Sequence, residues 1–187
     1  MSQLEKYKEL LLKWNKTHSL VSKSQALNLD EHIDDALSVS FFLGEEILDL
    51  GSGGGFPGIP LAIANPNKKI HLVESNTKKS SFLLNTSNKL DLKNVKVHNS
   101  RMEDLLPENF NDSLEIITRA FGPISRIVKS TEHFLSFKNN SLKLMQTAHR
   151  YNEEVLPQGY KETKQEKILL KGKDKGRILV TIELIKS

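Results

Sequence analysis

The sequence predicts a single α/β domain with a doubly wound, mostly parallel sheet that follows a helical N-terminal segment. Three observations predict this fold. The first 45 residues show helical periodicity, short apolar runs alternate with helical stretches from residue 46 onward, and no helical stretch separates the last two apolar runs. With 187 residues, 37% of them hydrophobic and 27% charged, the chain has the size and composition of one globular domain.

Residues 1–45 are expected to form a helical cap on this domain. Apolar side chains near the N-terminus recur every three or four positions, which predicts an opening amphipathic helix; they are Leu4, Tyr7, Leu11 and Trp14. At such positions Trp14 is expected to pack in the core rather than to stack on a nucleotide base. A second helix is predicted from about residue 25 to residue 42.

Residues 46–187 are expected to form the doubly wound core. Apolar runs predict strands at 47–50, 70–74, 95–98, 114–118, 142–146, 168–170 and 178–185, and helices are predicted near 59–65, 78–90 and 124–136. Strands that alternate with helices are typical of a parallel sheet. The stretch "KGKDKGR" at 171–177 joins the last two strands without a helix, so we expect an antiparallel edge strand to end the sheet.

The composition excludes several classes of protein and site. The chain has no cysteine, so disulfides, thiolate zinc sites and cysteine nucleophiles are excluded, and we assign no metal site. No apolar run has the length of a membrane span, and the first 16 residues are too charged for a secretory signal. We therefore expect a cytoplasmic protein that does not bind membranes.

The positive charge of the chain is concentrated near its C-terminal end. The formal net charge is +4, and residues 161–177 alone hold seven Lys or Arg against three acids. This segment predicts an anionic partner, with nucleic acid first, and it could contact phosphates. A solvated lysine-rich surface is an equally good interpretation.

The strand at 47–50 leads into a run of glycines that points to a ligand. Five of the twelve residues from Asp49 to Pro60 are glycine, more than a tight strand-to-helix turn needs. Glycine allows positive φ and leaves no Cβ between the backbone and a ligand. Ligands of doubly wound sheets bind at the carboxyl ends of the strands.

A phosphate-binding loop fits this run poorly. The P-loop pattern is absent, and the dinucleotide pattern matches only with Gly53, Gly55 and Gly58, three residues past the strand end. Pro57 and Pro60 also remove amide donors that a pyrophosphate would need.

S-adenosylmethionine, a sulfonium nucleoside without phosphate, fits the acids at the strand ends better. Asp49 ends the first strand, and Glu74, 23 residues beyond Gly51, is placed to accept hydrogen bonds from ribose hydroxyls. An acid such as Glu74 also occurs in NAD enzymes, so it supports a ribose without choosing the cofactor. The stretch "SRMED" at 100–104 follows the third strand, where an adenine pocket would lie; alternatively, Glu103 and Asp104 simply begin a helix.

The run "DLGSGGGFPGIPLAIANP" resembles the cofactor loop of the 16S ribosomal RNA guanine-N7 methyltransferases, the ribosomal small-subunit methyltransferase G or glucose-inhibited division protein B family. Further segments are similar in the same order: "WNKTHSL" at 14–20, "HIDDAL" at 32–37, "SRME" at 100–103, "TRAF" at 118–121 and "GRILVTIELIK" at 176–186. The resemblance covers nearly the whole chain.

The resemblance implies a Rossmann-like class I S-adenosylmethionine methyltransferase fold with a seven-stranded sheet. It implies methylation of a guanine N7 in the decoding-region loop of 16S ribosomal RNA. The partner would be 16S ribosomal RNA, the small ribosomal subunit or its precursor, and we expect a monomer.

Residue roles follow from the same resemblance, position by position. Gly51 and Phe56 would line the cofactor pocket, Met102 and Glu103 would hold the adenine, and Arg119 would reach the cofactor or the target. Asp49, Gly53 and Glu74, which the strand ends predict, complete the cofactor set. The family usually has asparagine in place of Ser19, and a Lys-Gly pair in place of Gln146-Thr147.

No catalytic residue is assigned, with Arg119 as the one candidate. Guanine N7 offers a lone pair and carries no proton, so its methylation needs no general base and depends on positioning. His18 and His32 are expected to be structural. From the residues alone two alternatives stay open: an NAD-dependent oxidoreductase, and a non-catalytic RNA-binding module on the same fold.

Overall fold

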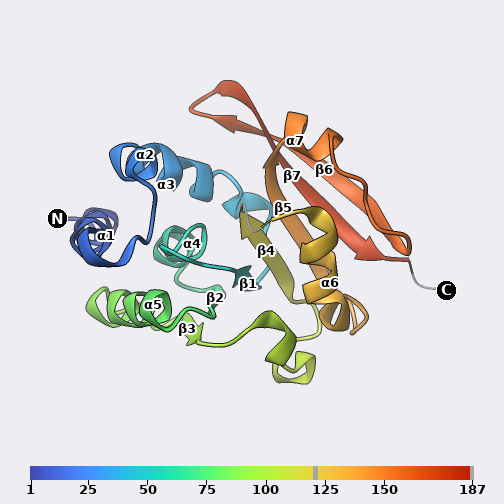
Figure 1. Ribbon diagram of the computed structural model, residues 1–187, viewed down its shortest axis with the longest axis horizontal. Coiled ribbons are helices and arrows are strands. Elements are labelled where there is room, and N and C mark those ends of the chain that lie inside the picture. The colour runs from blue at the N-terminus through green and yellow to red at the C-terminus, as the bar shows by residue number, and fades with distance from the viewer. Residues whose placement is uncertain (120–121, 186–187) are drawn as a thin grey trace.

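The computed structural model describes residues 1–119 and 122–185, which form a seven-stranded sheet covered by helices on both faces (Figure 1). The strand order is β3-β2-β1-β4-β5-β7-β6. The strands are β1 (Glu46–Leu50), β2 (Lys69–Val73), β3 (Val95–His98), β4 (Glu115–Arg119), β5 (Ser141–Thr147), β6 (Tyr160–Leu170) and β7 (Lys173–Leu184). The first five are parallel, and β7 runs antiparallel to both β5 and β6.

The helices pack on the two faces of this sheet. The α-helices are α1 (Gln3–His18), α2 (Lys23–Leu27), α3 (Leu29–Leu37), α4 (Gly58–Ala64), α5 (Thr77–Lys89), α6 (Ile124–Leu135) and α7 (Ala148–Asn152), and the short 3-10 helices are η1 (Ser40–Phe42), η2 (Met102–Asp104) and η3 (Pro107–Asn109). Alternate residues of β1 enter two apolar clusters. Ile47 belongs to the cluster that includes residues of α1, α3, α4 and α5, whereas Leu48 and Leu50 belong to the cluster that includes residues of α6.

The predicted α/β fold is therefore confirmed, with differences in detail. The antiparallel strand β7 lies between β5 and β6, so it is not the edge strand that was predicted; the sheet ends in β6. The helix predicted over 25–42 is divided into α2, α3 and η1. The hairpin predicted over 171–177 is a tight turn at Lys171 and Gly172, both with positive φ, and most of that stretch belongs to β7. The sequence underestimated β6 because this edge strand is largely solvent-exposed and carries polar side chains instead of an apolar run.

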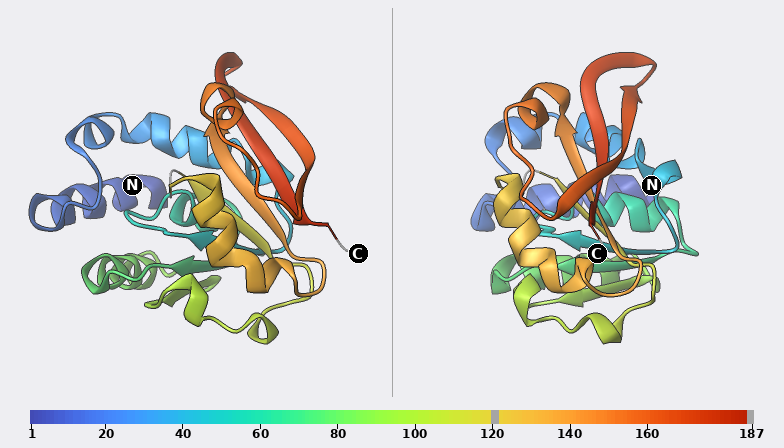
Figure 2. Two further views of the ribbon diagram at one scale, coloured as in Figure 1. Left: turned by 45° about the vertical axis from the view of Figure 1, so that its right-hand side comes forward. Right: turned by 90° about the vertical axis from the view of Figure 1, so that its right-hand side faces the viewer.

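The β6–β7 hairpin is fastened to α3 of the cap by ion pairs. Lys171 Nζ lies 2.8 Å from Asp34 Oδ2, and Lys175 Nζ lies 2.5 Å from Glu31 Oε1. By sequence, α3 carries four acids and no Lys or Arg, and the segment 161–177 has a surplus of four positive charges. The hairpin tip rises on the same side of the molecule as α3 (Figures 1 and 2). The basic charge of this segment is thus balanced by the cap, which weakens the prediction that it contacts phosphates.

A second contact joins α3 to the sheet at a buried carboxylate. Asp35 is 3% exposed, and its two oxygens lie 3.4 Å from Arg119 Nη1 and 3.4 Å from Arg177 Nε. Arg119 ends β4 and Arg177 belongs to β7, so one side chain of the cap links two strands.

Helix α4 begins in direct contact with the ends of β1 and β2. A Cβ on Gly58 would lie 2.2 Å from Leu72 Cδ2 and 2.7 Å from Asp49 Oδ2. Only glycine allows this approach without displacing one of these buried side chains.

We expect Gly58→Ala to destabilise the protein by about 1–3 kcal/mol, because the added methyl group must push apart packed side chains. Urea unfolding followed by circular dichroism measures the change. Gly44→Ala is the matched control, because its Cβ would meet Glu115 no closer than 3.5 Å. Equal stability of the two variants would contradict this packing argument.

We expect Asp35→Asn to lower the free energy of unfolding by roughly 3 kcal/mol, because it leaves two partly buried guanidinium groups without their carboxylate. The neighbouring Asp34→Asn removes an exposed ion pair and should cost less than about 1 kcal/mol. Thermal or urea unfolding of both variants checks the difference. A cost for Asp34→Asn as large as that for Asp35→Asn would argue against the buried link.

Candidate active site

The glycine loop after β1 folds back over the end of β2. Gly51 has a φ of 74° and donates its amide proton to the carbonyl oxygen of Val73, at 3.0 Å. Gly53 has a φ of 55° and donates to Glu74 Oε2, also at 3.0 Å. Positive φ at these positions is the conformation that the glycine-rich sequence predicted.

Asp49 lies beneath this loop as a fully buried carboxylate. Its Oδ2 accepts a hydrogen bond from the Gly58 amide at 3.0 Å. Its Oδ1 is shielded from solvent and has no hydrogen-bond partner among the described residues. Burial raises the pKa of the Asp49 carboxyl to about 7, against the lowering effect of the Gly58 hydrogen bond.

Glu74 follows β2 with its carboxylate held by two backbone amides. Oε2 accepts from Gly53, and Oε1 accepts from Asn76 at 2.8 Å. The side chain lines the hollow beside the loop. Each carboxylate oxygen can accept a further hydrogen bond, so Glu74 is oriented by the protein and can still accept from ribose hydroxyls.

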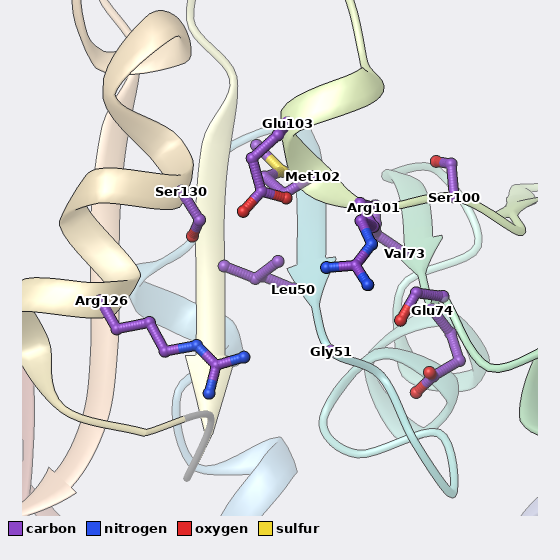
Figure 3. A pocket seen from close by; sticks show the side chains of 11 residues that line it. Leu50, Gly51, Val73, Glu74, Ser100, Arg101, Met102, Glu103, Arg126 and Ser130 are labelled. Atoms are coloured by element: carbon purple, nitrogen blue, oxygen red, sulfur yellow. The ribbon is translucent and has the colours of Figure 1, made fainter.

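A hollow of about 80 Å³ lies between the ends of β1 and β2 and the segment after β3 (Figure 3). In the figure the side chains of Arg101 and Glu103 reach toward Leu50, and Arg126 approaches from α6. Ser100 Oγ is also shielded from solvent, without a hydrogen-bond partner among the described residues. The lining residues are Leu50, Gly51, Val73, Glu74, Ser75, Ser100, Arg101, Met102, Glu103, Arg126 and Ser130.

Four of the eight predicted cofactor residues thus meet in one hollow: Gly51, Glu74, Met102 and Glu103. Met102 and Glu103 begin the short helix η2 and also line the hollow, so the helix start that was given as the alternative does not exclude a position at the hollow. Asp49 and Gly53 lie under and within the loop that closes the hollow. Arg101 and Arg126, two further lining residues, were not predicted, because no local pattern distinguishes them from surface cations.

Phe56 and Arg119 form a second group with the cap. The Arg119 guanidinium carbon lies 4.9 Å from the centre of the Phe56 ring, a cation–π contact. Arg119 Nη1 is also 3.4 Å from His32 Nδ1. Burial, followed by the charge of Arg119, lowers the pKa of His32, so this imidazole is neutral at pH 7. The remaining two residues of the "TRAF" segment, 120 and 121, lie outside the described part of the chain.

His32 and Asp35, three positions apart on α3, both belong to this group. Asp35 is buried and holds Arg119 and Arg177, a role that the sequence analysis missed. Its position on the helix was visible in the sequence. Its partners were not, because they come from strands more than 80 residues away.

The two departures from the family pattern have local structural correlates. Ser19 adopts left-handed backbone angles, φ 48° and ψ 51°, at the end of α1, a conformation that asparagine favours. The Thr147 side chain caps α7 by accepting from the Arg150 amide, and Gln146 Oε1 is buried with no partner among the described residues. Trp14 is half-buried and packs against the edge of the core, with its ring centre 5.7 Å from that of Phe82, so it is less enclosed than predicted.

The chemistry of the hollow suits a nucleoside without a diphosphate. Two acids, Glu74 and Glu103, line the hollow with two cations, Arg101 and Arg126. Asp49 lies beneath the loop, so the hollow has no surplus of positive charge that would favour a pyrophosphate. Asp49 Oδ1 and Ser100 Oγ have no hydrogen-bond partner among the described residues, which indicates that a ligand supplies one. A ligand with hydroxyl donors and positive charge, such as S-adenosylmethionine, fits this donor and acceptor set.

Among the described residues, no three His, Asp or Glu side chains are arranged to hold a metal ion. Within the same residues, every helix is too short or too polar to cross a membrane.

Comparisons with known proteins agree with this geometry. Residues 1–177 match the family model of rRNA small subunit methyltransferase G. Ribosomal RNA small subunit methyltransferase G of Chromobacterium violaceum is 37% identical over 185 residues, which cover 97% of this chain and 87% of that protein. The corresponding protein of Nitrosomonas eutropha is 34% identical over 171 residues, covering 83% and 79% of the two chains.

Solved structures show the same fold at low sequence identity. An S-adenosylmethionine-dependent methyltransferase from Aquifex aeolicus has a TM-score of 0.60 at 18% identity and covers 92% of this chain and 98% of its own. Magnesium protoporphyrin IX methyltransferase from Synechocystis, solved with bound S-adenosylhomocysteine, has a TM-score of 0.59 at 14% identity, with 87% of each chain covered. The chain therefore belongs to the rRNA small subunit methyltransferase G family, the S-adenosylmethionine-dependent methyltransferases of small-subunit ribosomal RNA.

Proposed function

We propose that the chain transfers the methyl group of S-adenosylmethionine to N7 of a guanine in the decoding-region loop of 16S ribosomal RNA. The observation that carries this proposal is the pair of strand-end acids, Asp49 and Glu74, joined to the glycine loop of a family member. The substrate would be the RNA, the small ribosomal subunit or its precursor, and the chain would act as a monomeric single domain in the cytoplasm.

Six of the eight predicted residues lie in or beside the hollow, which supports the roles proposed for them. Glu74 would accept hydrogen bonds from the ribose hydroxyls, because backbone amides already orient its carboxylate. Met102 and Glu103 would hold the adenine from η2. Gly51 and Gly53 would let the cofactor approach the backbone, and Asp49 would supply a negative charge beneath it.

Arg119 and Phe56 would form the wall between the cofactor and the RNA. Arg119 is held by Asp35 and by the face of the Phe56 ring. Two constraints fix its guanidinium, so it can contact the cofactor carboxylate or the target nucleotide without reorganising. It is a positioning group in either case.

The cofactor supplies a methyl group on a positively charged sulfur that leaves readily as the acceptor attacks. Guanine N7 attacks with a lone pair and releases no proton, so no residue needs to act as a base. The protein contributes by holding the two reactants in line, which can lower a barrier by roughly 7–11 kcal/mol. The absence of an assigned acid or base in the hollow is consistent with this reaction.

Methyl transfer to ribosomal RNA tests the proposal directly. Purified protein should transfer label from methyl-labelled S-adenosylmethionine to 16S ribosomal RNA or small subunits from cells that lack the protein. Mapping should then find 7-methylguanine in the decoding-region loop. RNA binding without transfer would favour the non-catalytic alternative, and binding of NAD with similar affinity would favour the oxidoreductase.

The raised pKa of Asp49 predicts a pH-dependent affinity for the cofactor. A cation binds better when Asp49 is ionised, so the Kd for S-adenosylmethionine should increase by up to about tenfold per pH unit as the pH falls below about 7. Asp49→Asn should weaken binding at pH 8 and flatten the profile. Calorimetric titration between pH 5.5 and 8.5 measures both effects.

The raised pKa of Asp49 also makes the stability of the fold depend on pH, in the opposite direction from cofactor affinity. The folded pKa of Asp49 lies above its unfolded value of 3.8, so the free energy of unfolding should fall as the pH rises from about 4 to about 7. Asp49→Asn should remove this part of the decrease. The exposed Asp91→Asn is the control, and it should leave the pH profiles of binding and stability as they are in the unmodified protein. Parallel profiles for the Asp49 variant and the control would contradict this assignment.

A further inference from the structure

The surplus positive charge of the protein lies on two neighbouring helices. By sequence, α1 holds four lysines and two glutamates, and α5 holds three lysines and no acid. Together they carry a net +5, compared with +4 for the whole chain. The rest of the chain is therefore nearly neutral, including the hairpin, whose charge is balanced by α3.

Among the described residues, six of these seven lysines have no ion-pair partner. Lys8 pairs with Glu5 and Asp30. Within residues 1–119 and 122–185, no carboxylate lies within ion-pair distance of the other six, and all of them are at least partly exposed. They are Lys6, Lys13, Lys16, Lys78, Lys79 and Lys89. We call this set the α1–α5 lysine face.

Helices α1 and α5 lie side by side (Figure 1), and the contacts at their ends show that they run antiparallel. Gln3 Nε2, at the start of α1, donates to the carbonyl oxygen of Leu90 after the end of α5, at 2.7 Å. Near the other end Trp14 contacts Phe82. Between the first pair of ends is an open hollow of about 410 Å³, lined by Lys6, Glu9, Leu10, Lys13, Lys89 and Leu90.

The α1–α5 lysine face leads away from the candidate active site. Lys78 and Lys79 lie in the first turn of α5, a few residues after Glu74. The end of α1 also leads to the glycine loop, where Val21 Cγ1 would lie 2.9 Å from a Cβ on Gly54. The lysines therefore extend from the edge of the cofactor hollow to the hollow at the far end of α1, a helix about 24 Å long.

We propose that the α1–α5 lysine face is the surface on which the phosphate backbone of the ribosomal RNA substrate docks. A polyanion of this length matches a row of unpaired cations, because each phosphate that meets a lysine releases a condensed counterion. Such contacts fix the register of the RNA and do not read its sequence. The proposal rests on the proposed RNA substrate, and it assigns docking to a different part of the chain from the 161–177 segment.

A triple variant tests the part of this face that is farthest from the cofactor hollow. With Lys6→Gln, Lys13→Gln and Lys89→Gln together, the Kd for 16S ribosomal RNA should rise at least about tenfold near 100 mM salt, because three phosphate contacts are lost. The slope of log affinity against log salt should become shallower by about two to three. The KM for RNA should rise, while kcat and the Kd for S-adenosylhomocysteine should be unchanged.

Two control variants distinguish docking from a general charge effect. Lys161→Gln, Lys164→Gln and Lys167→Gln together remove the same charge from β6 and should change the RNA Kd by less than threefold, about 0.6 kcal/mol. The Lys→Arg triple at positions 6, 13 and 89 should retain the affinity of the unmodified protein. An unchanged RNA Kd and salt slope in the first variant, or an equal loss in the β6 variant, would overturn the proposal.

The direct RNA-binding measurement keeps this proposal separate from the proposed function. If the unmodified protein transfers no methyl group, the methyltransferase assignment fails, and filter binding with the same variants still tests docking. If transfer occurs and the α1–α5 variant binds RNA normally, only the docking surface is wrong.

Discussion

The contact between the Asp49 carboxylate and the Gly58 amide is the constraint on which the candidate site depends. It places the start of α4 directly against the end of β1, and the missing Cβ of Gly58 makes that approach possible. The loop between them must then turn sharply, with positive φ at Gly51, Gly53 and Gly55. The cost of burying the carboxylate appears as the raised pKa of Asp49. Its Oδ1, next to the cofactor hollow, has no hydrogen-bond partner among the residues that the structure describes.

The helical cap also holds the glycine loop in place. Tyr7 of α1 donates its hydroxyl proton to the Gly54 carbonyl oxygen at 2.7 Å, so the first helix supports the back of the glycine loop. Asp35 of α3 holds Arg119, which in turn lies over Phe56 at the end of the same loop. The loop is thus fixed between the sheet and the cap, which explains how so many glycines can form an ordered structure.

The segment with the most positive charge in the sequence is not the surface that has the most unpaired positive charge in the folded protein. Three cations of the most basic stretch, Lys171, Lys175 and Arg177, form ion pairs with α3, the most acidic helix, and so join the hairpin to the cap. Six of the seven lysines of α1 and α5, all but Lys8, have no ion-pair partner among the described residues, although they are dispersed in the sequence. Which charges pair depends on which groups the fold brings together, so net charge along the chain does not locate a binding surface.

Local sequence determined most of the fold and part of the site. Buried strands β1, β2, β4 and β5 carry apolar runs because both of their faces are covered, and such runs are visible without a structure. Asp49 and Glu74 could be placed together because the carboxyl ends of parallel strands share one edge of the sheet.

The tertiary structure alone decided the length of β6, the partners of Asp35 and the surface on which unpaired lysines gather. β6 needs no apolar run, because an edge strand gains its hydrogen bonds from one neighbour and leaves its side chains in water. Asp35 and Arg119 are 84 positions apart, and Lys13 and Lys89 belong to different helices. Sequence periodicity shows which residues share one face of an element, whereas packing between elements brings distant charges together or leaves them free.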